Sequence, residues 1–150
     1  MSETIKNSER APEPVGLYPH GRRVGNLLFL SGIGPRVRGS KQIPGVTLAA
    51  DGSIASYDIE LQCRSVFANV RAVLEDSGSS WGNLVDVTVF LTNMRDDFPT
   101  YNRLWAEHFP DANSRPCQTT LEINALPTPI AIELKCVATV EGASINAKNV

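Results

Sequence analysis

The segment after Asp58 constrains the fold most, because its apolar side chains recur at every third or fourth residue. The positions on this stripe are Ile59, Cys63, Val66, Phe67, Val70, Val73 and Leu74. Asp58 carries the short acceptor side chain favoured just before a helix, and Gly78 can adopt the backbone common just after one. The pattern predicts an amphipathic helix whose wide apolar stripe covers one face of a sheet.

Strand patterns lie on both sides of this helix. The predicted strands are 22–24, 27–30, 85–91, 116–123 and 130–140. Gly25-Asn26 between the first two is a hairpin signal, because glycine accepts the positive φ of tight turns. The run 27–30 is apolar on both faces, which predicts a strand that is central in its sheet or lies under a helix. Residues 36–52 are expected to form a loop with weak strand content.

A second helix is predicted from a cap at Asp96 or Asp97 to a stop at Pro110. The order strand, strand, helix, strand, helix, strand, strand then predicts an α+β domain with both helices on one face of the sheet. The 150 residues suit a single domain, with a mobile or edge-hugging arm at 1–14 and a polar tail at 141–150. The uncovered sheet face predicts self-association.

Composition excludes several classes of protein. The formal net charge of −2 argues against a general nucleic-acid-binding surface. We expect no membrane partner, because the chain has no run of about 18 apolar residues. The polar N-terminus has no signal-peptide pattern, so a cytoplasmic location is expected. The cysteines are widely spaced without a CxxC motif, and no nucleotide-binding motif is present, so we expect neither a metal site nor a cofactor.

Single residues leave their chemistry open. Glu133 lies in the apolar last strand, and either faces solvent or provides a cleft carboxylate that moves protons. Arg115 is either a solvated loop charge or a planar fork for a substrate carboxylate. Cys117 is either a small core residue or a nucleophile. Tyr18 and Asn102 each either satisfy a local hydrogen bond or contact a ligand.

The remaining basic groups suggest surface roles. His20 and His108 are expected at the surface or at an interface rather than on a metal. The pairs Arg22-Arg23 and Arg36-Val37-Arg38 are either solvated or form an anion-attracting rim near the first hairpin. The residues by themselves do not name a reaction.

The chain resembles the reactive intermediate deaminase (Rid, YjgF-type) superfamily from about Pro14 to Val140. The segments that carry the resemblance are 16–18, 28–32, 69–74, 87–91, 101–102, 115–117 and 132–134. The resemblance implies a chorismate-mutase-like domain with a mixed β-sheet. It also implies a homotrimer, or a dimer of trimers, whose sheets form an inner barrel with active sites between subunits.

The resemblance further implies the residues of a site. Arg115 would bind the substrate carboxylate, and Glu133 would activate water. Residues that fall where the family lines its pocket are Tyr18, Ser31, Gly32, Asn102 and Cys117. The implied reaction hydrolyses an enamine or imine beside a carboxylate, releasing ammonia without a cofactor or metal.

Within the superfamily the chain is similar to the bacterial 2-aminomuconate deaminases, through residues 11–20 and 31–36, the insertion 39–52 and the turn 126–129. Leu17 stands where the family has the proline of Gly-Pro-Tyr. Ile33 stands where the family commonly has the glutamine of Gly-Gln after the serine. The substrate would be a dicarboxylate, 2-aminomuconate, converted to 4-oxalocrotonate in aromatic catabolism. The candidates for its distal carboxylate are His20, Arg22, Arg36 and Arg103, of which His20 and Arg36 flank pocket segments. The alternatives are a general 2-imino-acid deaminase and a trimeric carboxylate-binding protein without activity.

Overall fold

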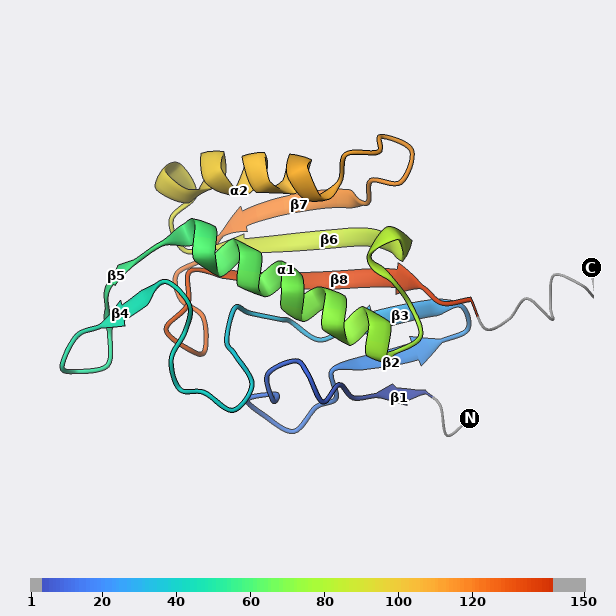
Figure 1. Ribbon diagram of the computed structural model, residues 1–150, viewed down its shortest axis with the longest axis horizontal. Helices are drawn as coiled ribbons and strands as arrows, with labels where there is room; N and C mark the ends of the chain where they lie inside the picture. Colours follow the sequence, from blue (N-terminus) through green and yellow to red (C-terminus); the bar gives the residue numbers. More distant parts are fainter. Residues whose placement is uncertain (1–3, 142–150) are drawn as a thin grey trace, which may run out of the picture.

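The computed structural model describes residues 4–141 and consists of a curved sheet with two helices on one side (Figure 1). The main sheet has the order β1–β2–β3–β8–β6–β7, and only the β6–β7 pair is parallel. Its strands are β1 (Ile5–Lys6), β2 (Gly21–Val24), β3 (Leu27–Leu30), β6 (Leu84–Leu91), β7 (Cys117–Glu122) and β8 (Ile132–Thr139). The helices are α1 (Ile59–Asp76) and α2 (Met94–His108). The predicted α+β class with a mixed sheet is confirmed.

Helix α1 begins and ends where the sequence indicated. The Asp58 carboxylate accepts hydrogen bonds from the backbone N–H groups of Glu60 and Leu61, at 2.9 and 3.3 Å. Gly78, with φ of +86°, follows the last turn. Both ends therefore have the local chemistry that limits a helix to this length.

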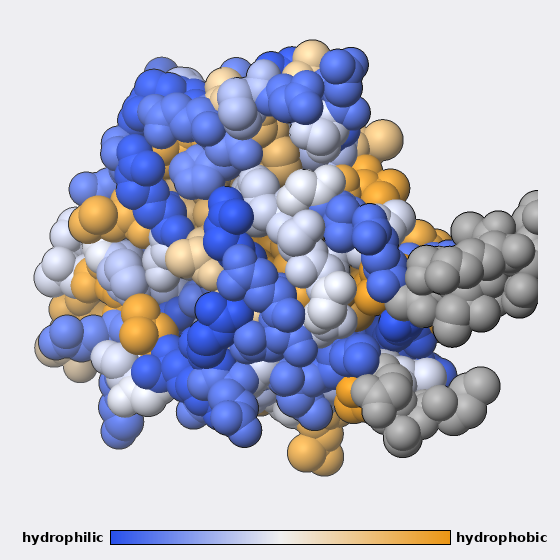
Figure 2. Space-filling model, turned by 45° about the vertical axis from the view of Figure 1, so that its right-hand side comes forward, coloured by the Kyte–Doolittle hydropathy of each residue, from blue (hydrophilic) through white to orange (hydrophobic). Residues whose placement is uncertain are grey.

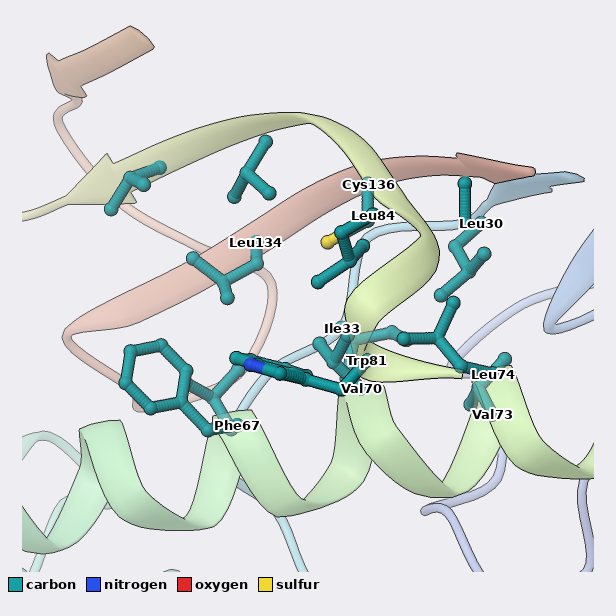
Figure 3. Packing of buried hydrophobic residues seen from close by; sticks show 14 of the residues in the cluster. Leu30, Ile33, Phe67, Val70, Val73, Leu74, Trp81, Leu84, Leu134 and Cys136 are labelled. Atoms are coloured by element: carbon teal, nitrogen blue, oxygen red, sulfur yellow. The ribbon is translucent and has the colours of Figure 1, made fainter. Parts of the chain in front are cut away.

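The core lies between α1 and the sheet (Figure 3). Phe67, Val70 and Leu74 point from α1 toward side chains of the sheet, among them Leu134 and Cys136. Trp81, in the short helix η1 (Trp81–Asn83), closes the layer and stacks on Phe109 at 4.8 Å between ring centroids. Each such buried side chain contributes roughly 1.5–3 kcal/mol to folding. This layer fixes the position of α1 over β8.

Three details differ from the sequence expectations, while the arm follows one of its two expected alternatives. Residues 46–48 and 54–57 form a separate hairpin of strands β4 (Val46–Leu48) and β5 (Ile54–Tyr57), beyond the loop that was expected. The arm is edge-hugging, and its β1 pairs with β2. Helix α2 is capped by Asn93, so the predicted cap at Asp96 or Asp97 was wrong. The last strand begins at Ile132 rather than Ile130. The tail beyond Glu141 lies outside the described residues.

The sheet face opposite the helices is uncovered in the single chain. Alternate residues of β8 are buried against the helices, and those between them are half-buried. Large apolar side chains are exposed on β3 and on the edge strand β7, including Leu27, Phe29 and Leu121 at about 40%. Figure 2 draws the molecule from the other side, where α1 lies, and that face is mostly hydrophilic, with apolar residues in separated spots. The central position of the strand 27–30 is confirmed, since β3 lies between β2 and β8.

Candidate functional site

Glu133 lies on the open face of the sheet, near the start of β8. Its neighbours Ile132 and Leu134 point into the core, so strand alternation turns Glu133 the other way. In the register of the sheet it lies opposite Phe90 of β6. The carboxylate is half-buried and lines a cavity. Of the two positions left open by the sequence, facing solvent or lining a cleft, Glu133 therefore has the second.

A one-residue shift in register brings the segment after β3 against this carboxylate. Phe29 pairs with Val137, whereas Ile33 bridges Leu134, so one extra residue is accommodated between these pairs. Such irregularities bend a strand and redirect its residues. Gly32 lies at this bend, and a Cβ placed on it would be 2.5 Å from the Glu133 Oε2. Only glycine leaves room for the carboxylate in this position.

Three further hydrogen bonds hold the bend. The Ser31 hydroxyl donates to the Pro19 carbonyl at 2.7 Å, and the Ser31 N–H donates to the His20 carbonyl at 2.9 Å. The Lys135 ammonium, on the same face as Glu133, donates to the Leu30 carbonyl. The Ser31–Gly32 segment is therefore tied to both neighbouring strands.

Side chains of α1 fix the loop that continues from this bend. The Asn69 amide donates to the carbonyls of Gly34 and Arg36, at 2.9 and 2.7 Å. The Ser65 hydroxyl donates to the Pro35 carbonyl at 2.7 Å. Because Ser65 and Asn69 are one turn apart, one face of α1 sets the backbone path on which Arg36 is carried.

The cavity around Glu133 has a volume of about 110 Å³. Its lining residues are Val15, Tyr18, Gly32, Gly34, Arg36, Pro127, Thr128, Ile130 and Glu133. Burial raises the pKa of the Glu133 carboxyl above its ordinary value, and the Arg36 guanidinium opposes this shift. A carboxyl group with a raised pKa holds a proton more readily than an exposed one, which suits it to exchange protons with a bound substrate.

The N-terminal arm forms the neighbouring wall. Tyr18, Ser31, Gly32 and Arg36 line a smaller hollow here, together with His20. His20 is buried: its Nδ1 accepts from the Ser8 N–H at 2.9 Å, and its Nε2 lies 2.8 Å from the Pro12 carbonyl. The ring therefore holds the arm in its Nε2–H form, and the expected surface or interface location of His20 was wrong. Both ring nitrogens are occupied by backbone groups.

The other predicted site residues lie away from this cavity. Arg115 is exposed before β7, where its Nε donates to the Phe109 carbonyl at 2.8 Å and its Nη2 to the Pro110 carbonyl at 3.3 Å. Cys117 is exposed on the open sheet face, not in the core, and Asn102 is exposed on α2.

The sheet register separates these residues from Glu133. Leu121 is in the row of Glu133, and Cys117 is four residues from Leu121 on β7, a distance of about 13 Å. Within one chain, therefore, Arg115 and Glu133 do not share a cavity. A site containing both needs a second copy of the chain.

One other hollow of the described residues, of about 190 Å³ beside α1, has a charged lining that includes Arg10, Arg64, Arg71, Glu75 and His108, but Arg10 and Arg64 are bound there in ion pairs. A hollow of about 700 Å³ lies at residues 37–48, but its lining includes no carboxylate, histidine or arginine. Residues 4–141 contain no cluster of histidine, cysteine and carboxylate side chains that could hold a metal ion. In the same part of the chain, no helix is sufficiently long and apolar to cross a membrane. The Glu133 cavity is the candidate site.

Comparison with known proteins identifies the family to which the chain belongs. The family model described as Endoribonuclease L-PSP matches residues 8–140. The chain belongs to this Rid/YjgF superfamily. A RutC family protein of Pyrococcus abyssi is 33% identical over 92% of this chain and 98% of that protein. The 2-iminobutanoate/2-iminopropanoate deaminase of Escherichia coli is 30% identical over the same two fractions. The crystal structure of the E. coli YjgF gene product has a TM-score of 0.75 and 28% identity, covering 90% of this chain and 97% of that one.

Sequence reasoning missed the residues that support the site. Asn69 and Ser65 are polar positions beside the apolar stripe of α1, and their spacing of four residues was the available signal. Lys135 lies two residues after Glu133 on the last strand. Residues two apart on a strand share a face, so the position of Lys135 on the face of Glu133 could have been predicted. Its contact with the Leu30 carbonyl depends on the shifted register, which the sequence does not indicate.

Proposed function

We propose that this Rid/YjgF protein hydrolyses an imine, or an enamine that tautomerises to one, next to a carboxylate. The observation that carries the proposal is the half-buried Glu133 carboxylate, packed against Gly32 in a cavity that also contains Arg36. The deaminase name of the E. coli relative supports the same type of reaction. The finer proposal is that the substrate is the dicarboxylate 2-aminomuconate, converted to 4-oxalocrotonate and ammonia.

The proposed site forms between neighbouring subunits. Arg115 is already held by the Phe109 and Pro110 carbonyls at an exposed end of the chain, so its side chain has a defined direction. The open sheet face, with exposed Leu27 and Phe29, is the surface on which a trimer would close. Arg115 of one subunit would then bind the carboxylate of a substrate located at Glu133 of the next.

The proposed reaction needs one carboxylate for two proton transfers. Glu133 accepts a proton from water as the water oxygen adds to C2 of the imine, and it passes this proton to the imine nitrogen to give a tetrahedral aminol. The same carboxylate then accepts the C2 hydroxyl proton and delivers it to the amino nitrogen as the C–N bond breaks, so that ammonia leaves and the keto group forms. Water and the imine are consumed, and ammonia and the 2-keto acid are formed.

The experiment compares Glu133→Gln and Arg115→Ala with the unaltered protein in assays of ammonia release and keto-acid formation. We expect Glu133→Gln to lower kcat at least 100-fold, and Arg115→Ala to raise KM and lower kcat together. Circular dichroism spectra check that both variants fold. Normal turnover by both folded variants would contradict the proposal, and binding without any ammonia release by the unaltered protein would favour a carboxylate-binding protein.

A general deaminase of 2-imino acids is the second candidate, because the E. coli relative is named for two monocarboxylate imines. Assays of the purified protein with 2-aminomuconate and with 2-iminopropanoate separate the two candidates. A higher kcat/KM for 2-iminopropanoate would favour the general deaminase.

A further inference from the structure

Arg36 has no carboxylate partner within ion-pair distance among residues 4–141. Ion pairs with glutamate or aspartate side chains, at 2.7–3.7 Å, are formed instead by Arg10, Arg38, Arg64 and Arg103. The Arg36 Nη2 instead donates to the Glu13 carbonyl at 2.7 Å, a neutral acceptor. A guanidinium has five N–H donors, so most of its capacity remains available for an anion.

This guanidinium is also held in place before any ligand binds. The backbone carbonyl of Arg36 accepts a hydrogen bond from the Asn69 amide of α1, and the Arg36 side chain is fixed by its hydrogen bond to the Glu13 carbonyl in the arm. It lines the same cavity as Glu133 and Tyr18. A cation fixed at the wall of a site loses little conformational entropy on binding, and charge-assisted hydrogen bonds to it are stronger than neutral ones.

The structure ranks the basic groups that could face a second substrate carboxylate. His20 has both ring nitrogens bound to the backbone. Arg103 is bound to Glu60 and Glu107. Arg22 lies on β2 and does not line the Glu133 cavity.

We infer that Arg36 binds a second carboxylate of the substrate and makes the site selective for dicarboxylates. This inference rests on the proposed function, in which Arg115 of the neighbouring subunit binds the carboxylate beside the reacting carbon. Arg36 and Arg115 would then hold the two ends of an extended diacid, with the reacting carbon next to Glu133. A monocarboxylate would leave Arg36 without a partner.

Binding of two stable ligands tests this inference without using the reaction. Muconate and sorbate are both six-carbon dienes, and they differ in the second carboxylate. Calorimetric titration of the unaltered protein should show muconate binding about 10- to 100-fold tighter than sorbate, the range expected for one charge-assisted contact. Arg36→Met should reduce muconate affinity to that of sorbate and leave sorbate affinity within about twofold. Arg36→Lys should retain part of the preference, because it keeps the charge without the fork.

The matched control is Arg23→Met, which removes one positive charge from a residue whose Nε binds the Gly25 carbonyl of the hairpin. It should leave the muconate preference unchanged. The inference is overturned if the unaltered protein does not prefer muconate, or if Arg36→Met weakens both ligands equally or leaves the preference intact in folded protein. Failure of the proposed function is a separate result, because it requires Glu133→Gln to retain ammonia release.

Discussion

The contact between Gly32 and Glu133 makes a single methyl group a test of the site. In Gly32→Ala the new Cβ would be 2.5 Å from the Glu133 Oε2 and 2.9 Å from its Cδ, inside any tolerable contact. The carboxylate has to withdraw from 2.5 Å to at least 3.4 Å, a movement of about 0.9 Å. Because the φ of Gly32 is not positive, the backbone itself accepts alanine.

The expected effect falls on activity rather than on stability. The atoms displaced belong to the end of a flexible side chain, so we expect the free energy of unfolding to change by less than about 1 kcal/mol. A misplacement of about 1 Å at a catalytic group costs on the order of 100-fold in rate. We therefore expect kcat/KM for imine hydrolysis to fall about 100-fold in Gly32→Ala.

The assay measures initial rates of ammonia release, with thermal unfolding as the check on the fold. Gly82→Ala is the matched control, because a Cβ at Gly82 meets no atom within 4 Å and its φ is not positive. It should retain full activity. The reasoning is refuted if Gly32→Ala retains more than about half of the activity while folded, since the Glu133 position would then not matter for the reaction.

Four further predictions follow from the contacts described above. The kcat/KM should decrease on acidification through the raised pKa of Glu133, at a higher pH than for an exposed glutamate. Because the folded-state pKa of Glu133 is raised, the protein loses stability as pH rises through that pKa and the half-buried carboxyl ionises. Glutamine stays neutral, so Glu133→Gln should raise Tm at pH 7. Asn69→Ala, which frees the Gly34 and Arg36 carbonyls, should lower kcat/KM about tenfold, and steady-state kinetics would measure it. Asp58→Ala should cost about 1 kcal/mol in urea unfolding without changing KM.

The parts of the fold with strong patterns could be predicted, and those with weak patterns could not. Helix α1 has a long apolar stripe and a cap, so its bounds followed from local chemistry. The β4–β5 hairpin is made mostly of exposed and half-buried residues, and its alternation is correspondingly weak. At the start of α2 the Asn93 side chain accepts from the Asp96 N–H at 3.2 Å, and the Glu122 carboxylate of β7 adds a tertiary contact by accepting from the Met94 N–H at 2.8 Å.

The candidate site divides in the same way. Strand alternation, a local property, indicated that Glu133 faces away from the core, but it left open whether the carboxylate faces solvent or lines a cleft. The contact with Gly32 depends on a register shift between β3 and β8, and the anchoring of His20 depends on where the arm returns. These are tertiary effects without a local pattern. Whether Arg115 and Cys117 share the site depends on a second chain, so that prediction stays open to experiment.

Mixed oligomers test the central claim, which is that Arg115 of one subunit and Glu133 of another form one catalytic site. Arg115→Ala and Glu133→Gln are co-expressed with different tags, and assemblies that carry both tags are assayed for ammonia release. Each variant alone should be nearly inactive. In a trimer that contains both variants, one of the three clefts has an intact residue from each neighbour, so about a third of the sites should be restored. Mixed assemblies that remain as inactive as the single variants would contradict the claim.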